Sequence, residues 1–234
     1  MPAGIPFFNT KTMSTIKNHL ADVLARLPQG VRLVAVSKFH PVEALQEAYE
    51  QGQRIFGESR VQELQAKHEA LPKDIEWHFI GHLQQNKVKY IAPYVSLVHA
   101  VDSLRLLQEI NRQALRCGRV IPCLLELHIA QEESKYGLTP EACEAMLAAG
   151  EWKALTGVEI TGLMCMASNT DDEAQIRREF HLAHKLFLRY KSLYFADKEY
   201  FKECSWGMSH DYPIAVEEGA TLVRVGSYIF GERI

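Results

Sequence analysis

The stretch RLVAVSK, residues 32–38, decides the fold, because it is a short and nearly continuous apolar run that ends in a serine and a lysine. A run of this kind is typical of a parallel strand that is buried on both of its faces. A helix is predicted over residues 41–51, with Pro41 at its start and Gly52 just after its end. The same strand-then-helix order recurs along the chain and indicates a parallel sheet.

The recurring units predict one large α/β domain. Further strands are expected over residues 54–57, 76–81, 96–101, 122–129, 158–166, 204–208 and 222–229. Helices are expected over residues 11–27, 60–71, 84–91, 102–117, 139–149, 171–193 and 212–218. Eight strand–helix units in about 200 residues are typical of a TIM-type (β/α)8 barrel, here with an extra N-terminal helix. We expect a leader over residues 1–10 and a single barrel domain over residues 11–234. An open, doubly wound sheet is the alternative.

Composition excludes several classes of protein. The 26 Lys and Arg against 29 Asp and Glu give a net charge of −3, whereas nucleic-acid binders normally carry a basic excess. There is neither a signal peptide nor an apolar run of 18 residues, so no membrane association is expected. Five cysteines without a C-x-x-C pair indicate reduced thiols in the cytoplasm. His181 and His184 lack further ligands, so no metal site is expected.

The C-terminal end of the first strand carries a candidate nucleophile. In barrels of this type the active site lies at the C-terminal ends of the strands. Alternate residues of a strand share a face, so Val34, Val36 and Lys38 point the same way and Lys38 reaches the mouth of the barrel. A lysine that is desolvated there becomes nucleophilic and suited to a Schiff base with an aldehyde. The alternative is a lysine that leaves the strand for solvent.

The ends of the seventh and eighth strands carry a candidate phosphate site. Ser209 follows the seventh strand, and Gly226 with Ser227 lies in the eighth, where barrels often hold phosphate. Serine hydroxyls and exposed backbone N–H groups supply the donors that a phosphate needs. Because the eighth strand pairs with the first in a closed barrel, this phosphate would lie beside Lys38 and near Arg224. Pyridoxal 5'-phosphate (PLP) is one candidate among several phosphorylated ligands.

Several short motifs, in order and at matching spacing, carry a family resemblance. They are AVSK (35–38), FGE (56–58), VQEL (61–64), WHFIG (77–81), NK (86–87), ESKYGL (133–138), TGLM (161–164), GMSHD (207–211) and VRVGSYIFG (223–231). Over most of its length the chain resembles the YggS/PROSC family of pyridoxal phosphate homeostasis proteins. The resemblance implies a single PLP-binding barrel like the N-terminal domain of alanine racemase.

The resemblance also implies roles for individual residues. Lys38 would carry PLP as a Schiff base, and Arg224 would face the pyridine nitrogen. The phosphate would be held by Ser209, Gly226 and Ser227, and the ring pocket would be lined by Val36, Ile80 and Met208. Two positions depart from the family pattern. Ser59 replaces an asparagine near the cofactor and can donate only one hydrogen bond, and His128 replaces an asparagine after the fifth strand and faces the pocket in this interpretation.

The same residues bear on whether the protein is an enzyme. An arginine opposite the pyridine nitrogen disfavours its protonation, and an unprotonated ring is a poor electron sink. Alanine racemase supplies a second base, a tyrosine, from an additional domain, and no such domain is expected here; Tyr228 points away from the site. We expect a PLP carrier or buffer without robust turnover and without catalytic residues, which transiently meets PLP-dependent apo-enzymes. A PLP-dependent amino-acid racemase is the alternative, and a phosphate-binding barrel enzyme without PLP is a third class.

Overall fold

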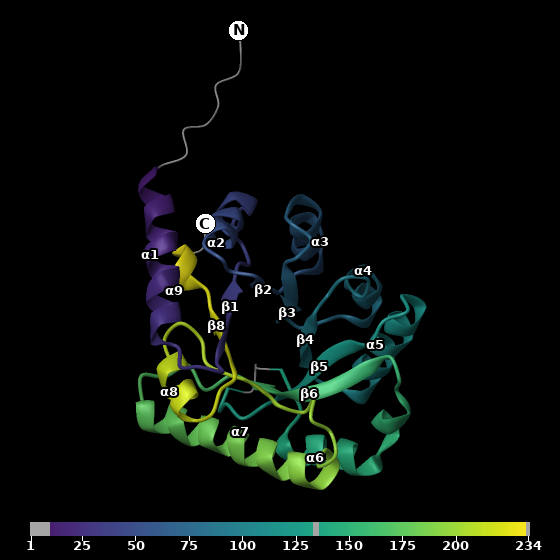
Figure 1. The fold of residues 1–234 in the computed structure, drawn as a ribbon. Coiled ribbons are helices and arrows are strands. Elements are labelled where there is room, and N and C mark those ends of the chain that lie inside the picture. Colours follow the sequence, from purple (N-terminus) through teal and green to yellow (C-terminus); the bar gives the residue numbers. More distant parts are fainter. Residues whose placement is uncertain (1–9, 133–135, 233–234) are drawn as a thin grey trace.

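Eight parallel strands close into a barrel in the computed structural model, which describes residues 10–132 and 136–232 (Figure 1). The strands are β1 (Arg32–Val36), β2 (Ile55–Glu58), β3 (Glu76–Phe79), β4 (Leu97–Val101), β5 (Ile121–Leu127), β6 (Val158–Cys165), β7 (Glu203–Ser205) and β8 (Leu222–Val225). Each strand pairs with the next along the chain, and β8 pairs with β1, so that Val34 lies opposite Arg224. The predicted (β/α)8 barrel is confirmed, and the open sheet is wrong. Residues 1–9 of the expected leader lie outside the described residues.

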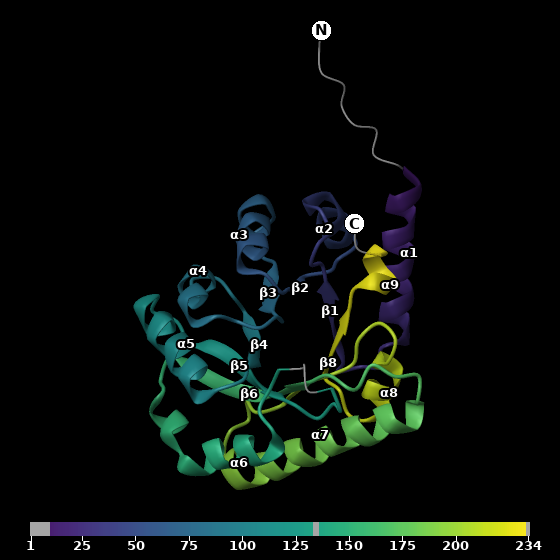
Figure 2. The ribbon, with the colours of Figure 1, turned by 180° about the vertical axis from the view of Figure 1, so that it is seen from behind.

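Helices follow the strands and surround the barrel, as the view from behind in Figure 2 also shows. They are α1 (Thr10–Arg26), α2 (Val42–Glu50), α3 (Val61–Ala70), α4 (Val88–Ile91), α5 (Leu104–Arg116), α6 (Pro140–Ala149), α7 (Glu173–Tyr194), α8 (Tyr212–Glu217) and α9 (Ser227–Phe230), with the 3-10 helices η1 (Gln85–Lys87) and η2 (Glu151–Ala154). The predicted extra helix is α1, which packs against α2 and α9. The longest helix, α7, runs along the side of the barrel that Figure 1 places at the bottom.

The strands separate two apolar cores because alternate side chains point to opposite faces. The larger core lies between the strands and the helices and includes Leu33 and Ala35 of β1. The smaller core consists of residues that face the barrel interior: Val34, Leu97, Ala100, Leu124, Met164 and Leu222. Since Val34 faces inward, the alternation predicts that Val36 faces the interior at the mouth of the barrel.

Strands β1 and β8 are shorter than the sequence predicted. β1 ends at Val36 rather than at Lys38, because the N–H of His40 donates to the carbonyl oxygen of Ser37 at 3.1 Å and closes a turn. β8 ends at Val225, and the prediction that the strand continues to residue 229 is wrong. The carbonyl oxygen of Gly226 instead accepts hydrogen bonds from the N–H groups of α9, so the chain turns away at Gly226. Both turns place polar residues at the mouth.

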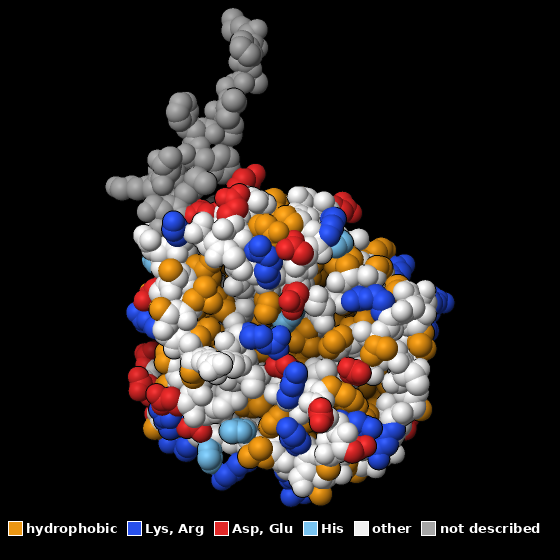
Figure 3. Space-filling view, viewed as in Figure 1, with side chains coloured by type: hydrophobic (Ala, Val, Ile, Leu, Met, Phe, Trp, Pro, Cys, Tyr) orange, Lys and Arg blue, Asp and Glu red, His pale blue; other side chains and the backbone are white. Residues whose placement is uncertain are grey.

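The surface carries charges of both signs. On the face that Figure 3 shows, Lys and Arg side chains are interspersed with Asp and Glu side chains, without a continuous basic track. Within residues 10–132 and 136–232, no helix is long and apolar enough to cross a membrane. In the same described part of the chain, no three His, Cys, Asp or Glu side chains are grouped as metal ligands would be.

Candidate functional site

A hollow of about 230 Å³ lies at the C-terminal ends of the strands. Its lining draws on β1, β3, β6, β7 and β8 and on the segments that follow them. The lining residues are Val36, Lys38, His40, Ile80, Met166, Met208, Ser209, His210, Arg224, Gly226, Ser227 and Gly231. The structure therefore brings together eight of the nine residues that the sequence singled out for the cofactor. His40, Met166, His210 and Gly231 were not anticipated.

The segment after β1, which carries Lys38, packs closely against the segment after β8, which carries Gly226. Lys38 is partly buried and lies in the turn after β1. The pairing of β1 with β8 continues to the mouth, where a Cβ atom added to Gly226 would lie 2.8 Å from the carbonyl oxygen of Val36. Only a glycine lets the two segments approach this closely, which leaves the Gly226 backbone open toward Lys38.

The segment after β7 is shaped by a left-handed glycine and a buried aspartate. Gly207 has a φ of 90°, and a Cβ there would lie 2.6 Å from the Cβ of Ala215. Asp211 stands at the start of α8, as expected, but its Oδ1 accepts a hydrogen bond from the N–H of Met208 instead of capping the helix. The hydroxyl of Ser209 accepts a hydrogen bond from the N–H of Gly226 at 3.2 Å. The segments after β7 and β8 thus meet directly, with their donors gathered in one place.

Arg224 is buried at the floor of the hollow and held by three acceptors. Its guanidinium donates to the carbonyl oxygen and the hydroxyl of Ser205 at 2.6 Å each, and to the carbonyl oxygen of Cys165 at 2.9 Å. Its side chain projects inward from β8, as Val34 does from β1, which explains how an arginine reaches the barrel interior. A fixed, charged donor therefore faces whatever occupies the hollow.

A chain of hydrogen bonds runs from Arg224 through the barrel interior. The hydroxyl of Ser205 lies 2.9 Å from Nδ1 of His99, and Nε2 of His99 lies 2.9 Å from Nδ1 of His78. Arg224 donates to the Ser205 hydroxyl, and the directions of the two hydrogen bonds beyond it follow the tautomer of the His99 ring. Burial lowers the pKa of His78 to about 3 and that of His99 well below its usual value, so both rings are neutral. The sequence analysis singled out neither His78 of β3 nor His99 of β4.

A buried carboxyl completes the floor. Glu126 of β5 is only 3% exposed, and its Oε2 has no hydrogen-bond partner among the described residues. Burial raises the pKa of Glu126 to about 7; nearby Asp102 acts in the same direction and Arg224 opposes it. The sequence analysis missed this residue, although a glutamate within an apolar run (PCLLELHI) was a visible signal.

Three other candidates lie away from the hollow. Ser59 does not line it, and its backbone instead packs against Gly81. His128 bonds through Nε2 to the carbonyl oxygen of Glu132 at 3.0 Å, within its own loop, so the expectation that it faces the pocket is wrong. Tyr228 does not line the hollow, but it lies on α9 rather than on a strand, so strand alternation is not the reason; its hydroxyl donates to Asp22 of α1. The runner-up lysine, Lys135, lies outside the described residues.

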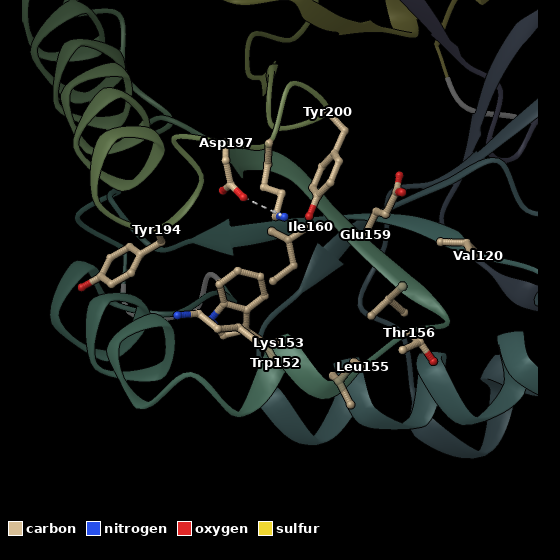
Figure 4. A pocket seen from close by; sticks show the side chains of 12 residues that line it. Val120, Trp152, Lys153, Leu155, Thr156, Glu159, Ile160, Tyr194, Asp197 and Tyr200 are labelled. Atoms are coloured by element: carbon tan, nitrogen blue, oxygen red, sulfur yellow. Dashed lines mark ion pairs between the residues drawn. The ribbon is translucent and has the colours of Figure 1, made fainter.

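A second hollow, of about 570 Å³, lies at the opposite end of the barrel (Figure 4). It is formed where β5 and β6 begin, with side chains from η2 and from the segment after α7. Figure 4 shows Trp152, Tyr194 and Tyr200 around it and the ion pair of Asp197 with Lys198 at 3.0 Å. This hollow is larger, but it lies at the end of the barrel that ordinarily serves stability.

Comparison with known proteins agrees with this geometry. The family model described as alanine racemase, N-terminal domain, matches residues 12–234. The pyridoxal phosphate homeostasis protein of Aquifex aeolicus is 38% identical over 226 residues, which cover 94% of this chain and 96% of that protein. PipY of Synechococcus elongatus PCC7942 has been solved without PLP, with 38% identity and a TM-score of 0.86, and with PLP bound, with 37% identity and a TM-score of 0.82. In both cases the match covers 92% of this chain and 100% of PipY.

The fold and the site therefore define a barrel of the alanine racemase N-terminal type. The alanine racemase of Clostridium difficile 630 shares this fold at 14% identity and a TM-score of 0.77, and the match covers 94% of this chain but only 57% of the racemase. Identity of this level shows the fold alone. By its much closer relatives, the chain belongs to the family of pyridoxal phosphate homeostasis proteins.

Proposed function

We propose that this protein binds pyridoxal 5'-phosphate on Lys38 and carries or buffers it in PLP homeostasis, without robust turnover. The observation that carries the proposal is the convergence of Lys38, Arg224 and the Gly226–Ser227 backbone on one hollow of about 230 Å³. The names of the relatives and the PLP-bound structure of PipY support the same ligand.

The residues fit PLP by their chemistry. The hydroxyls of Ser209 and Ser227 supply donors for a phosphate, and Gly226, which has no Cβ, lets the segments that carry them lie close together. Arg224 is held as a donor, which suits an unprotonated pyridine nitrogen. Val36, Ile80 and Met208 supply an apolar lining for the ring. When PLP is bound, its aldehyde condenses with the Lys38 amine to a carbon–nitrogen double bond, and one water leaves.

A carrier rather than a racemase is favoured by the surroundings of Arg224. A racemase needs groups that accept and return a proton on both faces of its substrate. Tyr228, a nearby tyrosine, is engaged with Asp22 on the outer side of the barrel. The hydrogen-bond chain behind Arg224 consists of neutral groups and keeps the guanidinium in place, so protonation of the pyridine nitrogen is disfavoured. We propose PLP-dependent apo-enzymes as transient recipients.

The proposal also covers the domain organisation and the cellular compartment of the protein. We propose that residues 11–234 form one domain and that the protein works in the cytoplasm. The five cysteines, four of them buried and one exposed, are all free thiols, which is consistent with a reducing compartment.

The experiment measures PLP binding in the wild type and in Lys38→Ala. We expect one PLP per wild-type chain, an absorbance band of bound cofactor, and a mass adduct on Lys38 after borohydride reduction. In Lys38→Ala the adduct disappears, whereas Lys89→Ala, a variant of an exposed lysine on α4, behaves as wild type. The proposal is wrong if wild type and Lys38→Ala bind PLP identically. Racemisation of an L-amino acid well above the rate of free PLP, abolished by Lys38→Ala, would instead establish the racemase.

A further inference from the structure

The segment that carries Lys38 is held from behind by three charged side chains, two of them buried and one half-buried. Glu58 lies at the end of β2, and Glu63 and Lys67 lie one turn apart on α3. The amine of Lys67 donates to Oε1 of Glu58 at 2.8 Å and to Oε1 of Glu63 at 2.6 Å. The Lys67 side chain is 5% exposed and that of Glu58 is fully buried. This Glu58–Glu63–Lys67 cluster lies between the barrel and the helical layer and does not line the hollow.

The cluster bonds to both peptide groups that flank Lys38. On one side, Lys67 donates to the carbonyl oxygen of Ser37 at 2.7 Å, and the hydroxyl of Ser37 donates to Glu58 at 2.6 Å. On the other side, the N–H of Phe39 donates to Oε1 of Glu63 at 2.6 Å. The two dihedral angles of Lys38 therefore lie between two peptide planes that charge-assisted hydrogen bonds fix in place.

The backbone beside Lys38 is also strained. Phe39 has a φ of 69°, and among residues 10–132 and 136–232 it is the only residue other than glycine with a positive φ. An L-residue with a large side chain adopts this conformation only where its surroundings enforce it, and such strain is concentrated at functional sites. Phe39 stands at the third position of the turn that His40 closes onto Ser37, and the hydrogen bond from its N–H to Glu63 holds this turn from the helix side.

Filling this space with charged side chains carries a large desolvation cost. Burial raises the pKa of Glu58 although Lys67 opposes the shift, and its Oε2 has no partner among the described residues. Apolar side chains of similar volume would pack between a helix and a barrel at a lower desolvation cost. A cluster that stabilises poorly but holds a backbone accurately is better suited to positioning than to packing.

We propose that Glu58, Glu63 and Lys67 are positioning residues that fix the Lys38 backbone, so that its amine meets the PLP aldehyde while the phosphate rests on the segments after β7 and β8. This inference rests on the proposed function. It divides PLP binding into two separable parts, since the phosphate segments do not touch the cluster.

The test separates the total PLP bound from the part that becomes fixed to Lys38. In Glu63→Gln we expect total binding, measured by equilibrium dialysis, to fall less than about threefold, because the phosphate donors remain. The fraction that borohydride fixes to Lys38, measured by intact mass after a short reaction, falls at least about tenfold, since the Phe39 anchor is weakened. Glu69→Gln, on the same helix but exposed, serves as the matched control and keeps both values.

A rescue experiment distinguishes positioning from general stability. Glycine adopts a positive φ without strain, so Phe39→Gly in the Glu63→Gln background should restore at least half of the fixed fraction. A structural role of Glu63 alone would leave the double variant as defective as the single one, and that result would overturn the proposal.

A second variant guards against misfolding of the first. Glu58→Gln and Glu63→Gln combined with Lys67→Met remove all three charges of the cluster together, and circular dichroism checks the fold of this variant. We expect the same division, with the fixed fraction lost and total binding retained. Wild-type values in this variant would overturn the proposal. If the wild type itself fixes no PLP to Lys38, the proposed function fails instead, and the two failures are thus distinguishable.

Discussion

The two halves of the barrel mouth are built in different ways. The half after β7 and β8 consists of two short segments, in which Ser209 and Ser227 present hydroxyl groups and the Gly226 N–H joins the segments by donating to Ser209. The half after β1 and β2 depends on charges that come from separate elements and converge on the turn around Lys38. The β7–β8 half is formed by residues that are close in sequence. The β1–β2 half is formed by residues that only the tertiary fold brings together.

The difference indicates a division of labour. A phosphate needs several donors at close range, which a tight glycine-containing turn supplies by itself. A lysine with four rotatable bonds needs an accurate backbone, and only groups on neighbouring elements can supply it. Substitutions in the first half should therefore weaken total PLP binding, and those in the second should mainly reduce the fraction that is fixed covalently to Lys38.

The largest effect is expected for Gly226→Val, which breaks the β8 half. A Cβ there would lie 2.8 Å from the carbonyl oxygen of Val36, so the two segments that form the site must move apart. We expect PLP affinity to fall at least about 100-fold, or about 3 kcal/mol, and the covalent fraction to be lost with it.

Gly118→Ala is the control for Gly226→Val. It introduces strain at a φ of 63° on an exposed turn far from the mouth, so it should lower the melting temperature without changing PLP affinity. Retention of wild-type affinity by Gly226→Val, measured by fluorescence titration, would show that the phosphate does not rest on this segment.

The floor that both halves share should give the protein a pH-dependent stability through Glu126. Its folded pKa of about 7 lies above the ordinary value of 4.5, so the protonated form stabilises the fold. That stability is full below about pH 4.5 and is lost as the pH rises to about 7, by about 3 kcal/mol in total. Urea unfolding at pH 4.5, 6 and 7.5 should therefore show Glu126→Gln gaining on the wild type as the pH rises.

The control for this pH dependence is Glu141→Gln, which removes an exposed carboxyl at the start of α6 and should follow the wild type at each pH. Parallel curves for Glu126→Gln and the wild type would mean that Glu126 is ionised in the folded protein over the whole range.

The smallest effect is expected for Ser209→Ala, which sharpens the comparison within the β7–β8 half. Its hydroxyl accepts one hydrogen bond from the Gly226 N–H and offers one donor to the phosphate. The loss of one such bond costs about 1 kcal/mol, or a fivefold weaker PLP affinity. Ser192→Ala, at an exposed position of α7, should leave the affinity unchanged, and an equal loss in both variants would contradict a role for Ser209.

Much of the fold followed from the sequence because buried parallel strands are apolar runs bounded by turns. The starts of β1, β3 and β8 were predicted to the residue. The ends were less predictable, since Ser37 and Gly226 fit a strand pattern equally well, and local hydrogen bonds to their carbonyl oxygens turn the chain there.

The site divides in the same way. Lys38, Ser209, Gly226 and Ser227 could be found because a barrel brings strand ends together. Lys67 could not, since it stands at ordinary i, i+4 spacing from a glutamate on a helix, a pattern that usually marks an exposed face. His128 was assigned to the pocket from its position after a strand, but its ring forms a hydrogen bond with a carbonyl oxygen of its own loop.

The closure of β8 onto β1 has a consequence for how the protein matures. The hollow straddles the seam between these two strands, and its two sides come from opposite ends of the sequence. The site therefore comes into being only with the slowest, most non-local step of folding, when the ring of strands is completed. A ligand of this hollow binds the finished barrel but no earlier intermediate, and by mass action it stabilises the seam itself. Bound cofactor would thus stabilise the pairing of β8 with β1. After the cofactor is released, the protein would unfold most easily by separation of these two strands.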